Sequence, residues 1–103
     1  MNNDPEQLAE ELAQRYNPKG LSPFPFENIL QDKQELEILQ IDLSTGLSGA
    51  ILFNPNSNKF RIIANRNKSE TRQYFTIAHE LGHYFLHSDL IKSEEGFIDG
   101  DGN

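Results

Sequence analysis

The chain has 103 residues, no cysteine, no tryptophan and a formal net charge of −7. This length predicts one small domain, and the lack of cysteine excludes a disulfide framework, a cysteine-based zinc finger and a thiol nucleophile. The acidic balance argues against a general nucleic-acid-binding protein, so no direct nucleic-acid partner is expected.

The sequence gives no sign of a membrane or secretory protein. No apolar run approaches the ~20 residues that span a bilayer. The first six residues, MNNDPE, are polar and acidic, unlike a signal peptide. We therefore predict a cytoplasmic protein with no membrane partner.

The N-terminal segment predicts a helix from Pro5 to Tyr16. Asp4 is a suitable N-cap residue, Pro5 suits a first helical turn, and residues 17–20 end the pattern. Residues 27–34 are ambiguous and fit a short helix. The apolar residues of the first helix recur at helical spacing: Leu8, Ala9, Leu12, Ala13 and Tyr16.

Three segments predict strands of one antiparallel sheet. Residues 35–43 show an imperfect apolar alternation, and residues 49–54 and 59–65 flank a clear turn that makes them a hairpin. We expect the third strand, around residues 60–65, to bind an extended peptide by strand addition.

A long helix is predicted from about Ser69 to His87. Asn67 and Glu70 have the spacing of a capping box at its start. Residues 88–103 are polar, acidic and glycine-rich, and are expected to be loosely ordered. The resulting fold class is α+β, with a small zincin-like domain over residues 1–92, incomplete at its C-terminus, and a tail or linker over residues 93–103.

The predicted helix carries the pattern HExxH, formed by His79, Glu80 and His83. Residues four apart lie one turn above each other, ~6 Å along the axis, so both imidazoles can reach one zinc ion. Glu80, one residue after the first histidine, projects beside the metal and can act as a general base. The alternative is a surface helix that binds no metal.

The residues around the motif favour a metal site. Gly82 lowers helix propensity by ~1 kcal/mol, which suggests that something packs closely there. An apolar stripe should bury the helix on the side away from the histidines, which would then face a cleft. The residues of this stripe are Phe75, Ala78, Leu81, Gly82 and Phe85.

The third histidine and the third ligand need separate treatment. His87 lies eight residues after His79, ~12 Å along the axis, so we interpret it as a supporting or helix C-terminal residue rather than a ligand. A catalytic zinc usually has three protein ligands. The candidates within the chain are carboxylates: Asp89, Glu94, Glu95, Asp99 and Asp101.

The segment from Arg72 to His87, RQYFTIAHELGHYFLH, resembles the signature of the ImmA/IrrE family of zinc metallopeptidases. The predicted order of elements is also similar to the N-terminal half of that family. The resemblance implies that His79 and His83 bind zinc and that Glu80 is the general base. It places the third ligand, a glutamate, on a later helix beyond Asn103, so we expect a truncated chain, with a degenerate family member as the alternative.

The resemblance also implies a substrate class. Family members cleave helix-turn-helix repressors or regulate transcription through such cleavage. The hypothesis is a zinc-dependent endopeptidase domain acting on an intracellular regulator such as a repressor, with Glu80 as general base on a zinc-bound water. The alternative is a non-catalytic protein-interaction module, or an inactive fragment that lacks the third ligand.

Five of the nine basic residues lie just before or within the start of the motif helix: Lys59, Arg61, Arg66, Lys68 and Arg72. They could steer an acidic substrate segment, or form a solvated edge that protects the hairpin from pairing. Arg72 lies near a helix N-terminus, where a cation is unfavourable, so it is expected to pair with a carboxylate such as Glu70 or one from a strand.

Overall fold

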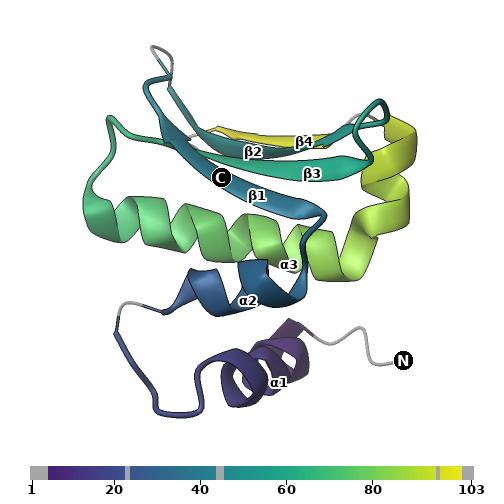
Figure 1. Cartoon of the computed structure of the whole chain (residues 1–103). Helices are drawn as coiled ribbons and strands as arrows, with labels where there is room; N and C mark the ends of the chain where they lie inside the picture. Colours follow the sequence, from purple (N-terminus) through teal and green to yellow (C-terminus); the bar gives the residue numbers. More distant parts are fainter. Residues whose placement is uncertain (1–4, 23, 44–45, 95, 101–103) are drawn as a thin grey trace. The chain divides into compact units, whose positions relative to one another are not determined.

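A computed structural model describes residues 5–22, 24–43, 46–94 and 96–100 of the chain (Figure 1). The chain divides into two compact units, Met1–Gln34 and Glu35–Asn103. In chain order the elements are α1 (Pro5–Tyr16), α2 (Phe26–Asp32), β1 (Leu36–Ile41), β2 (Leu47–Asn54), β3 (Lys59–Asn65), α3 (Glu70–Glu94) and β4 (Gly96–Gly100). The α+β class is confirmed.

The N-terminal unit contains the helices α1 and α2. The predicted bounds of α1 are confirmed, and the ambiguous segment 27–34 contains α2. Buried Tyr16 donates a hydrogen bond to the Asp32 carboxylate, and the Asn28 amide donates one to the Tyr16 carbonyl at 2.9 Å. Burial, together with the bond to Asp32, raises the pKa of Tyr16 above its usual value.

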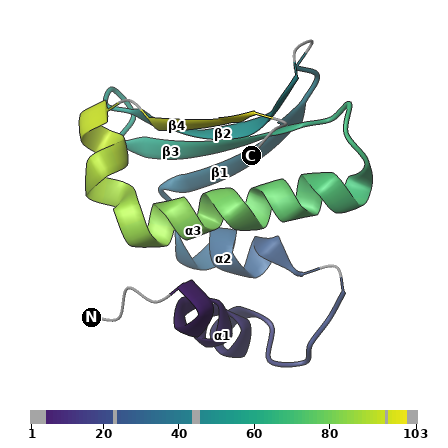
Figure 2. The same cartoon turned by 180° about the vertical axis from the view of Figure 1, so that it is seen from behind.

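The second unit is a sheet with one long helix, α3, along one of its faces (Figures 1 and 2). Its strands lie in the order β1-β3-β2-β4. β2 pairs antiparallel with β3 and with β4, whereas β1 pairs parallel with β3. The prediction of an antiparallel three-stranded sheet is therefore wrong in two respects: the sheet is mixed, and a fourth strand belongs to it.

Asn65, the last residue of β3, stabilises the connection that accompanies the parallel pairing of β1 with β3. The connection from β1 to β2 has to cross the end of β3, because these strands lie on either side of it. The Asn65 amide donates to the carbonyls of Leu43 (3.0 Å) and Leu47 (2.8 Å), and its oxygen accepts from the N–H groups of Leu43 (3.2 Å) and Asn67 (3.0 Å). One buried side chain thus holds both ends of the crossing connection.

Strand β4 lies in the segment that was predicted to be loosely ordered. Residues 96–100 pair with the outer edge of β2, from Leu52 beside Gly96 to Leu47 beside Gly100. The prediction is wrong for these residues because backbone pairing, which the edge of β2 offers to any extended segment, requires few apolar side chains. The rest of the predicted tail, residue 95 and residues 101–103, lies outside the described residues.

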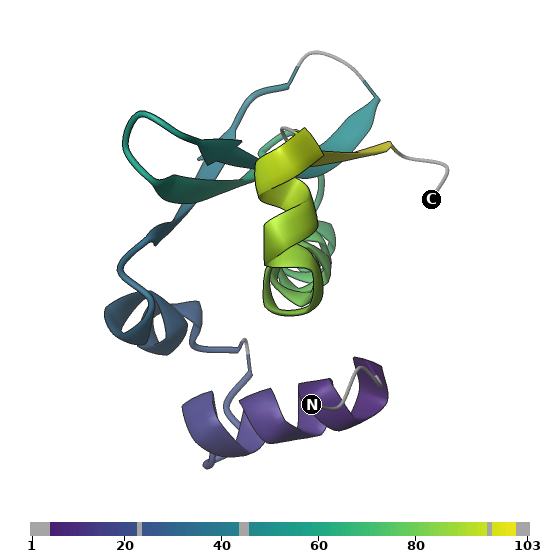
Figure 3. The ribbon, with the colours of Figure 1, turned by 90° about the vertical axis from the view of Figure 1, so that its right-hand side faces the viewer.

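Helix α3 runs further than predicted and is kinked. His87, its predicted end, has non-helical dihedral angles (φ −134°, ψ 26°), and the chain resumes helical geometry beyond it. The segment after the kink rises toward the sheet (Figure 3), where Ile91 is fully buried. The Lys92 ammonium lies over the rings of Phe53 (5.5 Å) and Phe60 (5.8 Å), a cation–π contact.

The start of α3 is capped by a different residue from the one predicted. The Ser69 hydroxyl accepts a hydrogen bond from the N–H of Arg72 at 3.1 Å, which is the N-cap geometry. Asn67 instead donates through its side chain to Asp42. The capping box of Asn67 and Glu70 is therefore not formed.

The face of α3 that packs on the sheet also differs from the prediction. Before the kink, its buried residues are Gln73, Thr76, Ile77, Glu80, Leu81 and Tyr84. They follow the i, i+3, i+4, i+7 spacing of one helix face. Of the stripe predicted to be buried, only Leu81 is buried, whereas Ala78 is exposed and Phe75 is 63% exposed.

Gly49 of β2 allows this close packing. A Cβ atom there would lie 2.3 Å from the Ile63 carbonyl oxygen and 2.6 Å from Cγ2 of Thr76 on α3. Real Cβ atoms do not approach backbone so closely, so glycine is required at this point.

A search of the described helices for a membrane-spanning segment finds none with the necessary length and apolar character.

We predict that Gly49→Ala lowers the free energy of unfolding by about 2 to 3 kcal/mol, because α3 has to move away from β2. The close packing expected at Gly82 is wrong, because a Cβ there meets none of the described residues within 4 Å. Gly82→Ala is therefore the matched control, and alanine there favours the helix by about 1 kcal/mol. Chemical denaturation measures both changes. Equal losses of stability in the two variants would contradict the packing described.

We predict that Asn65→Ala lowers the free energy of unfolding by about 2 to 4 kcal/mol, because it leaves backbone groups of the crossing connection without their partners. Asn56→Ala, in the exposed turn between β2 and β3, should change it by less than about 0.5 kcal/mol. Denaturation curves for the two variants test this. An Asn65→Ala protein as stable as the parent would show that Asn65 does not hold the crossing.

Candidate metal centre

The three residues of the HExxH pattern lie in the straight part of α3, before the kink. His79 is exposed, His83 is half-buried and Glu80 has no exposed surface at all. Each residue advances about 100° around a helix, so His79 and His83 lie within about 40° of each other. Glu80 lies about 60° further round, within the face that packs on the sheet.

The imidazoles of His79 and His83 face each other. Their Nε2 atoms are 3.2 Å apart, their ring centroids are 4.7 Å apart, and the ring planes are perpendicular at 89°. Two imidazole nitrogens bound to one tetrahedral zinc, each at ~2.0–2.1 Å, lie ~3.4 Å from each other. The two histidines therefore fit neighbouring positions around a single zinc ion through Nε2.

His87 is separate from this pair, as its interpretation as a non-ligand requires. Its ring centroid is 5.8 Å from that of His83, its side chain is exposed, and the kink in α3 falls on its own backbone. The regular helical geometry that places His79 and His83 one turn apart therefore does not continue through His87.

The described residues bring together two candidate ligands and not a third. No group of three His, Cys, Asp or Glu side chains within the described part of the chain is placed to hold a metal ion. Asp89 is exposed on the segment after the kink. The other carboxylates that the sequence suggested (Glu94, Glu95, Asp99 and Asp101) have side chains outside the described residues.

The polar contacts of α3 show which way the histidines turn. Arg72, on the same side of α3 as His79, donates to the Ser48 hydroxyl of β2 at 2.9 Å. About 100° further round, Gln73 accepts a bond from Gln40 of β1 at 2.8 Å, and Tyr84 donates to Glu35, just before β1. The histidine side of α3 therefore turns toward β2 and the edge strand β4.

Sequence reasoning missed these contacts because the strand order decides them. Tyr84 is the clearest case, since it binds Glu35 and places its ring edge-on against Phe60, with centroids 5.0 Å apart. Both contacts anchor α3 one residue after His83. A buried helical stripe through Gln73, Ile77 and Tyr84 was the only available signal.

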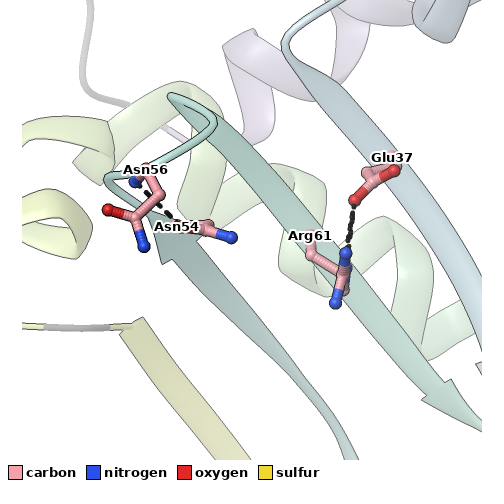
Figure 4. A network of polar contacts seen from close by, with 4 residues as sticks. All are labelled: Glu37, Asn54, Asn56 and Arg61. Atoms are coloured by element: carbon pink, nitrogen blue, oxygen red, sulfur yellow. Dashed lines mark hydrogen bonds and ion pairs between the residues drawn. The ribbon is translucent and has the colours of Figure 1, made fainter.

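The basic residues before α3 do not form one patch. Arg61 lies between buried Phe60 and Ile62, so its side chain projects from the sheet face opposite α3. There it forms an ion pair with Glu37 at 2.9 Å (Figure 4). The pair lines a shallow groove of about 240 Å³, together with Leu52, Phe53, Asn54, Pro55 and Lys59. This groove is on the wrong face to serve the histidine pair.

One comparison with known proteins gives a match. Residues 31–102 match the family model Peptidase_M78, described as the IrrE N-terminal-like domain. The matched segment contains all four strands and α3 with its HExxH pattern. No curated protein and no solved structure matches the chain.

We predict that the chain binds one Zn²⁺ ion through His79 and His83. His79→Ala or His83→Ala should weaken the affinity more than about 100-fold, because removing a ligand costs more than disturbing its surroundings. His87→Ala is the matched control and should leave the affinity unchanged. Titration in competition with a chromophoric chelator measures all four proteins, and an equal loss in His87→Ala would contradict this assignment.

Proposed function

The chain belongs to the family of IrrE N-terminal-like peptidase domains, and from this membership and the His79–His83 pair we propose that it is a zinc-dependent endopeptidase domain. The observation that carries the proposal is the 3.2 Å separation of the two Nε2 atoms on one side of α3. In this assignment His79 and His83 hold the metal. When bound, zinc acts as a Lewis acid that polarises a peptide carbonyl and makes water more acidic.

Glu80 supplies the proton transfer in this proposal. Its carboxylate accepts a proton from the water that attacks the scissile carbonyl, and then gives that proton to the leaving amine. Its position supports this role, because it lies on the helix between the histidine pair and the sheet. Burial there keeps the carboxylate away from bulk water and holds it in one place.

A peptide substrate can add to the sheet only at a free edge. We expected β3 to accept it, but β3 is paired with β1 on one side and with β2 on the other, so that expectation is wrong. Among the described strands the edges are β1 and β4, and the histidine side of α3 turns toward β4. The β4 edge is therefore the one that we assign to the substrate backbone.

We assign an intracellular protein regulator as the substrate class, with a helix-turn-helix repressor as its representative. The support is the resemblance of the segment from Arg72 to His87 to the ImmA/IrrE signature, whose members act on such repressors. A cytoplasmic location goes with this substrate class.

A non-catalytic interaction module is the second candidate function. It is favoured by one observation: no group of three His, Cys, Asp or Glu side chains among the described residues is placed to hold a metal ion, so the His79–His83 pair has no third partner there. In this case the chain would bind the same regulator without cutting it. Zinc would then serve to hold the binding surface together rather than to activate water.

We predict that zinc-loaded protein cleaves a purified helix-turn-helix repressor and that Glu80→Gln reduces the rate at least about 100-fold, because the proton acceptor is lost. Gln has the shape of Glu, so zinc affinity should be unchanged. Mass spectrometry of the products measures cleavage. Cleavage that survives in Glu80→Gln contradicts the role of Glu80, whereas stoichiometric binding of the repressor without cleavage indicates the interaction module.

A further inference from the structure

Arg72 is a half-buried cation without an acidic partner among the described residues. One guanidinium nitrogen donates to the Ser48 hydroxyl at 2.9 Å. Its Nε is buried and has no acceptor within the described residues, and no described carboxylate lies within ion-pair distance of it. The prediction that Arg72 pairs with Glu70 or with a strand carboxylate is therefore wrong.

This environment favours the arrival of an anion. A guanidinium has five N–H donors in a planar fork that matches a carboxylate, and charged groups away from water are stable only when paired. Arg72 also lies in the first turn of α3, where the helix dipole opposes a positive charge. A carboxylate that reaches the half-buried guanidinium from its open side would pair with its charge and offset the dipole.

Arg72 is aligned with the candidate metal centre. It precedes His79 by seven residues, so the two lie within about 20° of each other around α3 and ~10.5 Å apart along its axis. An extended peptide covers that distance in about three residues. Between them lies Phe75, which is 63% exposed and has its ring centroid 5.9 Å from the Arg72 guanidinium carbon.

We propose that Arg72 is a specificity-determining residue that binds a carboxylate of the substrate about three residues from the scissile bond, with Phe75 contacting the intervening segment. The inference rests on the proposed function, since it takes His79 and His83 as the point where the peptide is cut. The carboxylate belongs either to an Asp or Glu side chain or to the C-terminus of the peptide. Both sources present the same two oxygens to the guanidinium.

Three capped heptapeptides of Ala and Ser test the proposal on the zinc-loaded chain and on the metal-free chain. The first has an internal Glu and an amidated end, the second has Gln and a free C-terminal carboxylate, and the third has Gln and an amidated end. NMR titration gives each dissociation constant and follows the Arg72 Nε–H resonance. At least one carboxylate peptide should bind about tenfold more tightly than the neutral peptide and shift that resonance.

The parent chain and three variants distinguish recognition of the carboxylate by Arg72 from a purely structural role of that residue. Arg72→Gln should remove the preference while keeping the affinity for the neutral peptide, and Arg72→Lys should retain part of it. Arg66→Gln removes the same charge from an exposed position nearby and should keep the full preference. At a net charge of −7, non-specific electrostatics would favour the neutral peptide, so a preference for the acidic one has to be local.

Equal binding of all three peptides by the parent chain, or a preference that persists in Arg72→Gln, would overturn the proposal. Zinc titration of the same samples shows which hypothesis has failed. If the parent binds zinc but does not discriminate between the peptides, the assignment of Arg72 fails and the proposed function stands. If the chain discriminates between the peptides but does not bind zinc, Arg72 binds a carboxylate, but the proposed function fails and with it the placement of that carboxylate relative to a scissile bond.

Discussion

The close packing of α3 on β2 is the constraint on which the rest of the second unit depends. A side chain at Gly49 would collide with the Ile63 carbonyl and with Thr76 of α3, so the helix and the sheet meet at a distance that only glycine permits. The contact is made in one rotation of α3 about its own axis, with Thr76 toward β2. That rotation buries Thr76, Glu80 and Tyr84, and it leaves His79 exposed at the side of the helix.

The same rotation gives the histidines and Glu80 of the candidate site different environments. The histidines, which need access to a metal and to a peptide, lie at the rim that turns toward β4. Glu80 lies on the face of α3 that packs on the sheet, where its carboxylate is fully buried. Burial of a carboxylate costs free energy, and such costs are concentrated at functional sites rather than distributed through a core. The arrangement therefore supports the proposed roles, with Glu80 as a buried proton acceptor beside an exposed pair of candidate metal ligands.

Local signals in the sequence predicted the local structure well. The bounds of α1 and β3 were predicted to the residue, because capping residues, turn residues and apolar periodicity mark them. The segment that carries the HExxH pattern is helical, as predicted. The strand order was not predicted, because the parallel pairing of β1 depends on Asn65 bonding to residues some twenty positions earlier in the chain. The buried face of α3 was mispredicted because apolar spacing favoured Phe75 and Ala78 over the polar residues Gln73, Thr76 and Glu80. A histidine pair at four-residue spacing needs only one helix, so it could be found from the sequence, whereas the position of Arg72 beside Ser48 needs the sheet.

The central claim is that His79 and His83 together hold a zinc ion on α3. X-ray absorption spectroscopy at the zinc edge of the zinc-loaded chain tests it most directly, because imidazole ligands give a distinct multiple-scattering pattern. We predict two imidazole nitrogens at ~2.0–2.1 Å in the parent protein and one in His79→Ala. A first shell made only of oxygen, or a spectrum that does not change in His79→Ala, would contradict the account.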